Sequence, residues 1–485
     1  MFLGIDIGTS GVKAVAVDGD GAVVDQSVVE LSVSRPAPLH SEQNPSDWWA
    51  ATNKAVANIA KEHRKATMAI GLSGQMHGAT LIDASGNAIR PAILWNDGRS
   101  LKECAELEQA LPSLGEITGN RAMPGFTAPK LLWLRKHEPA IFEKIVKVLL
   151  PKDYVRLRMT GDYASDMSDS AGTLWLDTKA RDWSDTVLEA CSLNRDHMPA
   201  LYEGNEFTGK LRGELAEAWG MARVPVAAGG GDNAAGAVGS GTVRTGDAFL
   251  SLGTSGVTFL ADNAYRPNPA GGVHTFCHAL PHRWHQMSVM LSAASAVDWV
   301  ARTTGFSDPA SFFAAIEKRN QPATTEIFLP YLSGERTPHN NPLAQGVFFG
   351  LTQTSDAASL GQAALEGVAF GLADGIDALH DTGARIETLT VIGGGARSQY
   401  WGKILSSVFD QPLIYRKGGE VGPAYGAARL ARLALTGEEI EDVCAPPPIE
   451  TIIEPSEKLS EQLAIRRPLF QALYKSLETH FTENA

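Results

Sequence analysis

The sequence predicts an α/β fold built from two related domains. The chain has 485 residues, which is more than one compact core usually covers. The stretch 7–12 (IGTSGV) recurs nearly unchanged at 252–257 (LGTSGV), about half a chain later, and self-similarity at this spacing indicates a duplicated unit. Within each half, strand-like and helix-like stretches alternate, which is typical of α/β folds with central mixed sheets.

The first half begins with a predicted strand–turn–strand unit around Gly8–Gly11. The segment 44–47 has the composition of a helix start, and residues 48–64 after it carry an amphipathic pattern that predicts one helix. The apolar run 68–72 then predicts a short strand. This order of strands and helix is the one expected of an α/β domain.

The second half begins with the second copy of the same unit, at 252–257. Residues 389–392 predict a strand that enters the glycine turn 393–395. Apolar residues then recur at helical spacing on one face: Trp401, Ile404, Leu405 and Val408. The second half therefore has the same alternation as the first.

A proline cluster at 446–448 separates this half from a last helical segment that is too short to be a domain. We therefore expect a first domain at 1–244, a second domain at 245–440 and a C-terminal helical tail at 441–485.

The charge balance excludes several kinds of partner. The 42 basic residues against 55 acidic ones leave a net charge of −13. No basic stripe is available to neutralise phosphates, so we expect no binding to nucleic acid or to anionic membranes. One small anionic ligand held by local backbone amides remains compatible with this composition.

The cysteines and the N-terminus indicate the compartment. The cysteines lie far apart without a C-x-x-C pair, which favours buried reduced thiols: Cys104, Cys191, Cys277 and Cys444. Asp6 stands where a secretory signal needs an apolar core. No apolar stretch approaches the roughly 20 residues of a membrane span. We expect a soluble, cytoplasmic protein.

The two copies of the repeated turn are candidate phosphate sites. Thr9 in the first copy, and Gly253 and Thr254 in the second, belong to tight turns that expose backbone N–H groups and hydroxyls. A plain hairpin turn is the commoner use of such residues, but the duplication favours a ligand. Asp6 precedes the first turn and Ser251 the second, so one side of a nucleotide cleft could handle Mg²⁺ and the other phosphate oxygens.

A glycine-rich segment, 228–236, contains Asp232 directly after three glycines. Glycines allow close approach of the backbone to a ligand, and a carboxylate at this place can accept a proton from an attacking hydroxyl. Asp232 could equally be the N-cap of a helix, and both roles can hold at once.

Three further segments carry polar groups. Residues 73–78 (SGQMHG) offer neutral donors and acceptors for an uncharged polyhydroxylated ligand. The turn containing Gly394 and Gly395 opens onto a predicted helix and favours an anion or nucleotide. For the loop 334–341 (GERTPHNN), a structural role is at least as well supported as ligand contact.

With these segments in place, the chain resembles the FGGY carbohydrate kinases, members of the actin/Hsp70/hexokinase superfamily. Residues 125–134 (GFTAPKLLWL) are similar to the first family signature, and 346–351 (GVFFGL) to the start of the second. The resemblance extends from Asp6 to about Ala428. It implies two related domains of the ribonuclease H-like type, with a nucleotide cleft between them.

The resemblance also implies the reaction and its residues. Segments 73–80, 94–99, 150–154 and 331–340 are similar to family members that phosphorylate a ketose, with D-xylulose the best candidate, giving D-xylulose 5-phosphate in xylose catabolism. ATP is the implied donor and Mg²⁺ the implied metal. The implied ketose site comprises Met76, His77, Asp232 and Asn233, with Trp95 as a lesser candidate.

In the same resemblance Asp232 is the general base, and Asp6 lies near Mg²⁺ as a further catalytic residue. Thr254, Gly394 and Gly395 face the nucleotide. A homodimer is plausible on the same basis.

Two alternatives remain open. One is a related kinase for another sugar, such as L-ribulose or gluconate; glycerol is disfavoured because glycerol kinases have an Arg-Glu pair where this chain has Met76 and His77. The other is a non-catalytic nucleotide- or sugar-binding sensor on the same scaffold. Asp232 in its glycine-rich setting argues against a pure switch, but not against a ketose sensor.

Overall fold

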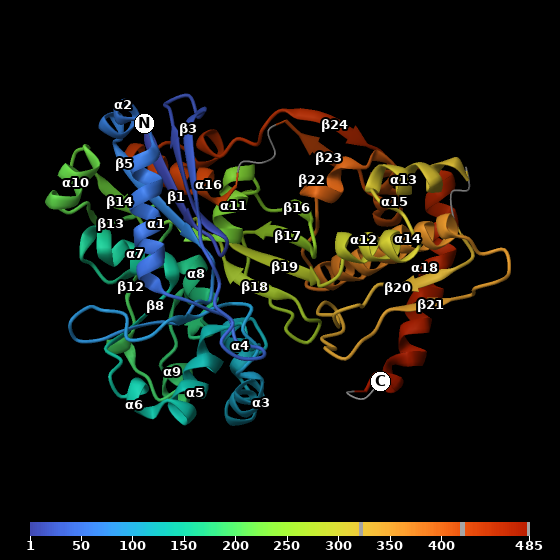
Figure 1. Ribbon diagram of the computed structural model, residues 1–485, viewed down its shortest axis with the longest axis horizontal. Coiled ribbons are helices and arrows are strands. Elements are labelled where there is room, and N and C mark those ends of the chain that lie inside the picture. The colour runs from blue at the N-terminus through green and yellow to red at the C-terminus, as the bar shows by residue number, and fades with distance from the viewer. Residues whose placement is uncertain (320–323, 418–421, 483–485) are drawn as a thin grey trace.

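The computed structural model describes residues 1–319, 324–417 and 422–482. Within these residues the chain forms two lobes, each built around a seven-stranded mixed sheet with helices packed on it (Figure 1). The predicted α/β class and the central mixed sheets are therefore confirmed.

The internal repeat marks the same strand core in both lobes. β1 (Phe2–Ile7) and β2 (Gly11–Val17) pair antiparallel, as do β16 (Asp247–Leu252) and β17 (Gly256–Asp262). The first strand of each pair also has a parallel neighbour, which is β5 (Ala69–Gly74) for β1 and β22 (Thr388–Ile392) for β16. Each repeated turn therefore lies at the end of a central strand.

The remaining strands extend these cores. The first sheet runs β13 (Phe207–Lys210), β14 (Pro225–Ala227), β5, β1, β2 and β3 (Val23–Glu30), with β15 (Gly230–Gly231) also paired to β5. The second runs β18 (His274–Cys277), β19 (Trp284–Met290), β17, β16, β22, β23 (Leu413–Arg416) and β24 (Ile449–Ile453). Short paired strands are β4 (Glu42–Gln43), β6 (Thr80–Ile82), β7 (Ala92–Ile93), β8 (Lys147–Leu149), β9 (Ala164–Asp166), β10 (Leu176–Asp177), β11 (Asp182–Trp183), β12 (Ala200–Tyr202), β20 (Ile327–Leu329) and β21 (Val347–Phe349).

The helices fall into two chain segments. Those up to the first connection between the lobes are α1 (Pro45–Asn58), α2 (Lys61–Ala66), α3 (Leu101–Ala110), α4 (Leu114–Thr118), α5 (Thr127–His137), α6 (Pro139–Phe142), α7 (Pro151–Thr160), α8 (Met167–Ala171), α9 (Asp185–Ala190), α10 (Gly213–Trp219) and α11 (Asp232–Ser240). Those after it are α12 (Ala294–Thr303), α13 (Pro309–Lys318), α14 (Ala357–His380), α15 (Gln399–Phe409), α16 (Pro423–Thr436), α17 (Ile440–Val443) and α18 (Glu457–Leu477).

The prediction of a single helix at 48–64 is wrong, because two helices, α1 and α2, occupy this range. α1 starts after Asn44, whose side chain accepts a hydrogen bond from the Ser46 N–H. Ile59 leaves the helical conformation with ψ 136°, and the Asp25 carboxylate accepts the next free N–H, that of Ala60, at 2.8 Å. A tertiary hydrogen bond thus ends the helix where the amphipathic pattern continues.

The other expected elements are confirmed. β5 covers the apolar run near 68–72, and β22 covers 389–392. α15 buries Trp401, Ile404 and Leu405 on one face, as their spacing predicts. Before α15, a 3₁₀ turn at Gly394–Arg397 follows the strand, so the helix begins four residues after Gly395 and not directly on the glycines.

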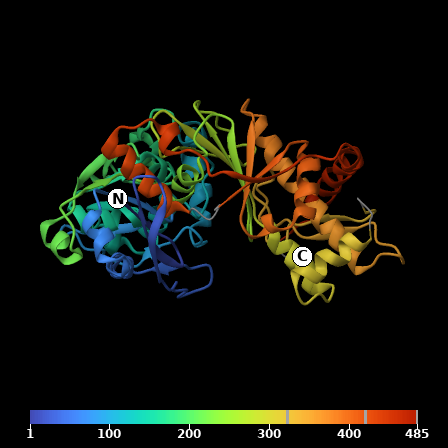
Figure 2. The ribbon, with the colours of Figure 1, turned by 90° about the horizontal axis from the view of Figure 1, so that it is seen from above.

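Helix α16 belongs to the second half of the chain but packs in the first lobe. It comes after β23 of the second sheet, yet it packs against β1 and β5 of the first, and β24 then returns to the second sheet (Figure 2). The domain boundaries at 244/245 and 440/441 stay a prediction, while α16 lies inside the predicted second segment and packs on the first sheet.

The contact of α16 with the sheet depends on glycines. Gly4 and Gly71 are paired neighbours on β1 and β5. A Cβ added at Gly4 would lie 1.8 Å from the carbonyl oxygen of Ala424, and one at Gly71 would lie 1.8 Å from that of Ala427. The helix therefore rests directly on sheet backbone, which any larger residue would prevent.

Buried side chains also join the lobes. One apolar cluster contains Leu131 and Trp175 from the first lobe together with Phe249, Phe259 and Phe276 from the second sheet.

The four cysteines are buried and carry free thiols, as predicted. In the described part of the chain, none of the helices combines the length and apolarity needed to cross a bilayer.

We expect Gly71→Ala to destabilise the fold by more than about 3 kcal/mol, because the added methyl overlaps a helix carbonyl and neither backbone can yield. Urea unfolding followed by circular dichroism measures the change. Gly19→Ala is the matched control: a Cβ there meets no described atom within 4 Å, so its stability should stay within about 0.5 kcal/mol of wild type. Equal stability of the two variants would contradict this account of the α16 contact.

Candidate active site

Two carboxylates meet at one edge of the first sheet. β1, β5 and β15 are parallel, with Asp6 beside Ser73 and Gly231 beside Gly74. Because the carboxyl ends of parallel strands lie at the same edge, Asp6 and the residue after β15, Asp232, come together there. The sequence predicted both residues as site residues but not this pairing.

The environment raises the pKa of both carboxyls. Burial, together with the negative charge of Asp232, raises the pKa of Asp6 to about 7. Burial raises the pKa of Asp232 to about 6, although two hydrogen bonds from Asn233 oppose this shift. Carboxyls so displaced from their ordinary values are typical of functional sites.

Asp232 is not the N-cap of α11. Gly231 occupies the cap position and Asp232 is the first helical residue. The Oδ1 atom of Asp232 accepts from the backbone N–H of Asn233 at 2.8 Å and from its side-chain amide at 3.1 Å. The capping hypothesis is therefore wrong, and the second carboxylate oxygen is left for another partner.

The glycines before Asp232 are required by close packing. Gly229 has φ +76°, and a Cβ there would lie 1.7 Å from the carbonyl oxygen of Leu72. A Cβ on Gly231 would lie 2.9 Å from Cγ of Met76. The glycine run thus lets β15 pair closely with β5 and pack against the buried Met76, and Asp232 follows it directly.

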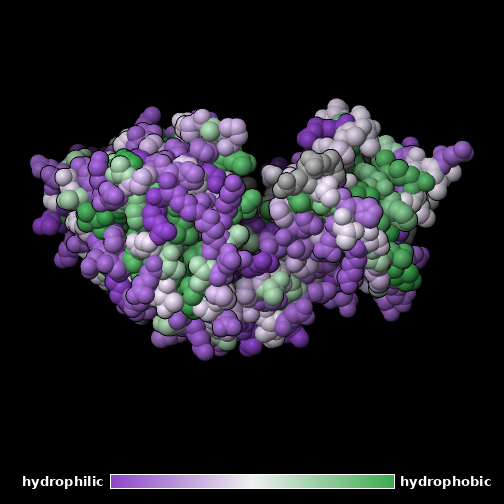
Figure 3. Space-filling model, turned by 90° about the horizontal axis from the view of Figure 1, so that it is seen from below, coloured by the Kyte–Doolittle hydropathy of each residue, from purple (hydrophilic) through white to green (hydrophobic). Residues whose placement is uncertain are grey.

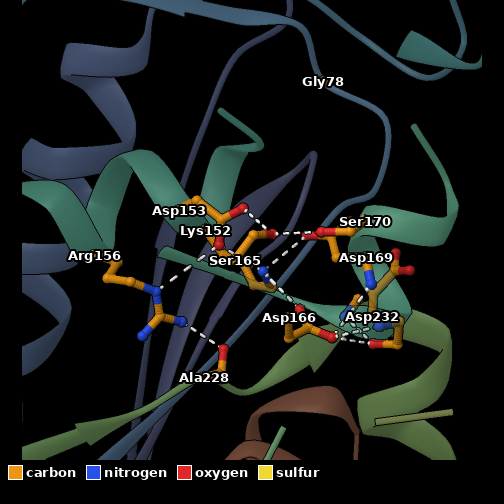
Figure 4. Close-up of polar contacts among 12 residues, drawn as sticks. Gly78, Lys152, Asp153, Arg156, Ser165, Asp166, Asp169, Ser170, Ala228 and Asp232 are labelled. Atoms are coloured by element: carbon orange, nitrogen blue, oxygen red, sulfur yellow. Dashed lines mark hydrogen bonds and ion pairs between the residues drawn. The ribbon is translucent and has the colours of Figure 1, made fainter. Parts of the chain in front are cut away.

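A buried ionic cluster supports this glycine run (Figure 4). The Nζ atom of Lys152 lies 2.6 Å from Asp153, 2.7 Å from Asp166 and 3.2 Å from Asp169, and none of these side chains is exposed. The Ser168 hydroxyl donates to Asp166 and accepts from the Gly231 N–H at 3.1 Å. The cluster is thereby hydrogen-bonded to the backbone one residue before Asp232.

Arg156 holds the strand that leads to the same glycines. Its guanidinium donates to the carbonyl oxygen of Ala227 at 2.9 Å. It also donates to the carbonyl oxygen of Ala228 (Figure 4). Lys152 and Arg156 both come from α7, so one helix supports the ionic cluster and also the backbone that leads into β15.

His77 lies beside Met76 with a fixed ring. Its Nδ1–H donates to the carbonyl oxygen of Gly172 at 2.6 Å, which leaves Nε2 as an acceptor in the neutral ring. Burial, with a smaller contribution from Lys130, lowers the pKa of His77 to about 3. The ring of Phe126 packs edge-on against the imidazole, with 4.8 Å between the two ring centroids.

Trp95 and Thr9 belong to one chain of hydrogen bonds. The Trp95 indole, 49% exposed, donates to the Thr9 hydroxyl at 3.0 Å, and that hydroxyl donates to Gln75 at 2.9 Å. The Gln75 amide donates to Gln43, which donates back to the Thr9 carbonyl. The Thr9 hydroxyl is therefore engaged, and only its backbone N–H is left for a phosphate.

The remaining nucleotide candidates lie in the second lobe. A cavity of about 1370 Å³ brings together Gly253, Thr254, Gly394 and Gly395. Its walls come from α12, α13 and α15, and Figure 3 shows the surface notched between the two lobes. The structure thus groups the predicted residues into a carboxylate and polar set in the first lobe and a glycine-lined cavity in the second.

The loop 334–341 makes structural contacts. Glu335 accepts from the backbone N–H of Leu291 at 2.9 Å, and Thr337 donates to Gly272. Arg336 donates to the neutral His274 at 3.4 Å. These bonds agree with the structural role considered for the loop.

Sequence reasoning missed Lys152 and Gln75 as supporting residues. Each lies in a segment that carried the family resemblance. Nothing in a linear pattern indicates that a lysine is buried, so their contacts became visible only in the fold.

Comparison with known proteins identifies the scaffold. The family described as "FGGY family of carbohydrate kinases" matches with its N-terminal domain at residues 1–239 and its C-terminal domain at 248–435. The chain is 55% identical to the xylulose kinase of Escherichia coli (strain K12), covering 98% of this chain and 99% of that protein. It is 52% identical to the xylulose kinase of Klebsiella pneumoniae, covering 99% of each.

A solved structure agrees. The crystal structure of "a xyloylose kinase from Brucella ovis" superposes with a TM-score of 0.96 at 49% identity, covering 99% of both chains. The full-length likeness includes both sheets and the edge that carries the carboxylate pair.

We expect Lys152→Met to lower the free energy of unfolding by about 3–5 kcal/mol, because three buried carboxylates lose their cation. Urea unfolding measures the loss. Arg195→Met is the control, since this arginine bridges Asp182 and Asp185 while 48% exposed, and exposed pairs contribute about 0–1 kcal/mol. A Lys152→Met protein as stable as the control would show that the cluster is not needed for the fold.

Proposed function

This chain belongs to the FGGY family of carbohydrate kinases, and from this premise we propose that it transfers the γ-phosphoryl group of ATP to D-xylulose, forming D-xylulose 5-phosphate. The observation that carries the proposal is the position of Asp232, which directly follows a glycine packed against Met76. Met76 in turn precedes His77, whose Nε2 is left as an acceptor because Nδ1–H donates to Gly172. The full-length similarity to proteins named xylulose kinase supports the choice of sugar.

The second lobe is suited to the nucleotide. The cavity of about 1370 Å³ is large enough for ATP, and its glycines and Thr254 offer backbone N–H groups to phosphates. Thr9 contributes its backbone N–H from the first lobe, since its hydroxyl is engaged.

Asp6 is suited to Mg²⁺. Its Oδ1 atom is buried and, among the described residues, has no hydrogen-bond partner. No cluster of three or more His, Cys, Asp or Glu residues suited to a metal occurs in that part of the chain. A single carboxylate agrees with the way Mg²⁺ binds in kinases, through one or two carboxylates plus phosphates and water. When bound, the metal would spread the charge that develops on the phosphoryl oxygens.

The sugar site favours a neutral polyol. Nε2 of His77 can accept a hydrogen bond from a sugar hydroxyl, the Asn233 amide can donate one, and the exposed indole of Trp95 offers an apolar face. A substrate carboxylate bound against His77 would place its oxygen lone pairs against the lone pair of Nε2. This disfavours gluconate relative to a ketose such as D-xylulose or L-ribulose.

Asp232 acts as the general base. With a pKa of about 6 it is mostly ionised at neutral pH, yet it is basic enough to take a proton in the transition state. It accepts the proton of the terminal sugar hydroxyl while that oxygen forms its bond to phosphorus and the bond to the ADP oxygen breaks. Alignment of the two lobes and exclusion of water supply the rest of the rate gain.

ADP release with Mg·ATP tests the function, against D-xylulose, L-ribulose, glycerol and gluconate in parallel. We expect kcat/KM to be at least about tenfold higher for D-xylulose than for the others, since a few mismatched hydroxyl contacts reach that ratio. Preference for another sugar would keep the kinase and reject the substrate. Binding of ATP and D-xylulose without turnover would favour the sensor alternative.

Asp232→Asn should fold with wild-type stability but lose about 100- to 10,000-fold in kcat, because the amide cannot accept the proton. Steady-state assays with D-xylulose measure kcat, and circular dichroism checks the fold. Asp162→Asn is the control, a carboxylate of the same lobe outside the site. Near-normal kcat in the Asp232 variant would remove this residue as the base.

A further inference from the structure

Lys130 is a buried lysine in a different environment from Lys152. It lies on α5 with no exposed surface, and its Nζ donates to the carbonyl oxygens of His77 and Gly125, each at 2.8 Å. Among the described residues it forms no ion pair, whereas Lys152 has three carboxylates. The proposed reaction so far uses Lys152 as a support and leaves Lys130 without a role.

A buried amine without a carboxylate destabilises a fold unless its hydrogen bonds compensate. Burial lowers the pKa of Lys130 well below its usual value. A methionine would fill the same space with no polar group to desolvate. The hydrogen bonds to the two carbonyl oxygens are therefore what a lysine can make at this position and an apolar residue cannot.

The first of these carbonyls belongs to a residue in an uncommon conformation. His77 has φ +68°, a region that residues other than glycine rarely adopt and that persists only where surrounding contacts hold it. Its carbonyl oxygen accepts from Lys130 and also from the Thr127 hydroxyl at 3.2 Å. Both donors come from the first turn of α5.

With the backbone held by α5 and Nδ1 held by Gly172, the imidazole of His77 is fixed at both ends. In the part of the chain that the structure describes, Nε2 makes no hydrogen bond. The ring also contacts Phe126, which immediately precedes α5. The direction of the free Nε2 lone pair is thus set by the contacts of His77 with α5 and Gly172, since β5 ends three residues before His77.

The second carbonyl connects Lys130 to Trp95. A Cβ on Gly125 would lie 2.5 Å from the carbonyl oxygen of Trp95, so the two backbones are in direct contact. Lys130 holds Gly125 through its carbonyl oxygen. One side chain therefore fastens the loop of His77 and the loop that supports Trp95.

We propose that Lys130 is the positioning residue of the sugar site, holding His77 in its left-handed conformation and Trp95 in register so that Nε2 faces a hydroxyl of the sugar. The inference rests on the proposed function and deepens it. It assigns a purpose to the lysine of the 125–134 segment, and it predicts an effect on sugar binding that is separate from nucleotide binding, because the nucleotide candidates lie in the other lobe.

Lys130→Met tests this against Lys136→Met, an exposed lysine of the same helix that pairs with Glu103 and Glu106. We expect KM for D-xylulose to rise about 10- to 100-fold in Lys130→Met, as loss of hydrogen bonds to a buried group would produce, while KM for ATP changes less than about twofold. Lys136→Met should match wild type. Equal rises in both KM values, or none, would overturn the proposal.

A milder variant covers the case in which Lys130→Met does not fold. Thr127→Val removes the other donor to the His77 carbonyl without changing the shape of the side chain. We expect KM for D-xylulose to rise about threefold, with KM for ATP unchanged, as the loss of one neutral hydrogen bond would produce. A rise in KM for ATP instead would contradict a role confined to the sugar site.

A measurement without substrates separates this inference from the proposed function. ¹⁵N NMR of histidine-labelled protein, with His77 assigned through His77→Gln, should show a neutral Nδ1–H tautomer down to pH 5 in wild type and in Lys136→Met. In Lys130→Met the signal should shift or titrate. If it does not, the positioning role is rejected; if it does and D-xylulose is not phosphorylated by wild type, only the proposed function fails.

Discussion

The direct contact between α16 and the first sheet is the constraint on which the two-lobe arrangement depends. Gly4 and Gly71 leave the sheet surface bare, so that helix carbonyls lie against strand backbone. On its other side α16 receives α11, where a Cβ on Gly426 would lie 1.7 Å from the carbonyl oxygen of Ala235. Arg429 of α16 then donates to Val238 and Gly239 at the C-terminal end of α11. Because α11 begins with Asp232, the helix that returns from the second lobe also sets the position of the proposed base.

Around that base the protein buries charge in three different ways, each with its own consequence. Lys152 is surrounded by carboxylates, so it serves as a rigid support for the glycine run. Among the described residues the partners of the Lys130 amine are two carbonyl oxygens, so its hydrogen bonds are made to backbone and not to an opposite charge. Asp6 and Asp232 are buried close together, and burial raises the pKa of both, with the charge of Asp232 adding to the shift of Asp6. This last arrangement agrees with the proposed roles of the pair, in which Asp6 binds a metal and Asp232 accepts a proton.

Much of the fold could be predicted from the sequence because it depends on local signals. The repeated Gly-Thr-Ser-Gly turns, the strands near 68–72 and 389–392, and the apolar face of α15 are all encoded within a few residues. Prediction failed where a distant partner decided the outcome. Asp25 divides the expected long helix, and Trp95 with Gln75 occupies the hydroxyl of Thr9. The capping hypothesis for Asp232 failed locally, because the neighbouring Gly231 takes the cap position.

The sequence by itself determined the fold class, the duplicated core, the family and the short set of polar residues from which the site is made, because composition and motif are properties of the linear chain. Only the tertiary structure decided which of these residues meet. It placed Asp6 beside Asp232 through the register of three parallel strands, and it made His77 an acceptor through the carbonyl of Gly172. It also gave Lys130 and Lys152 opposite surroundings, since burial and hydrogen-bond partners arise from segments far apart in the chain.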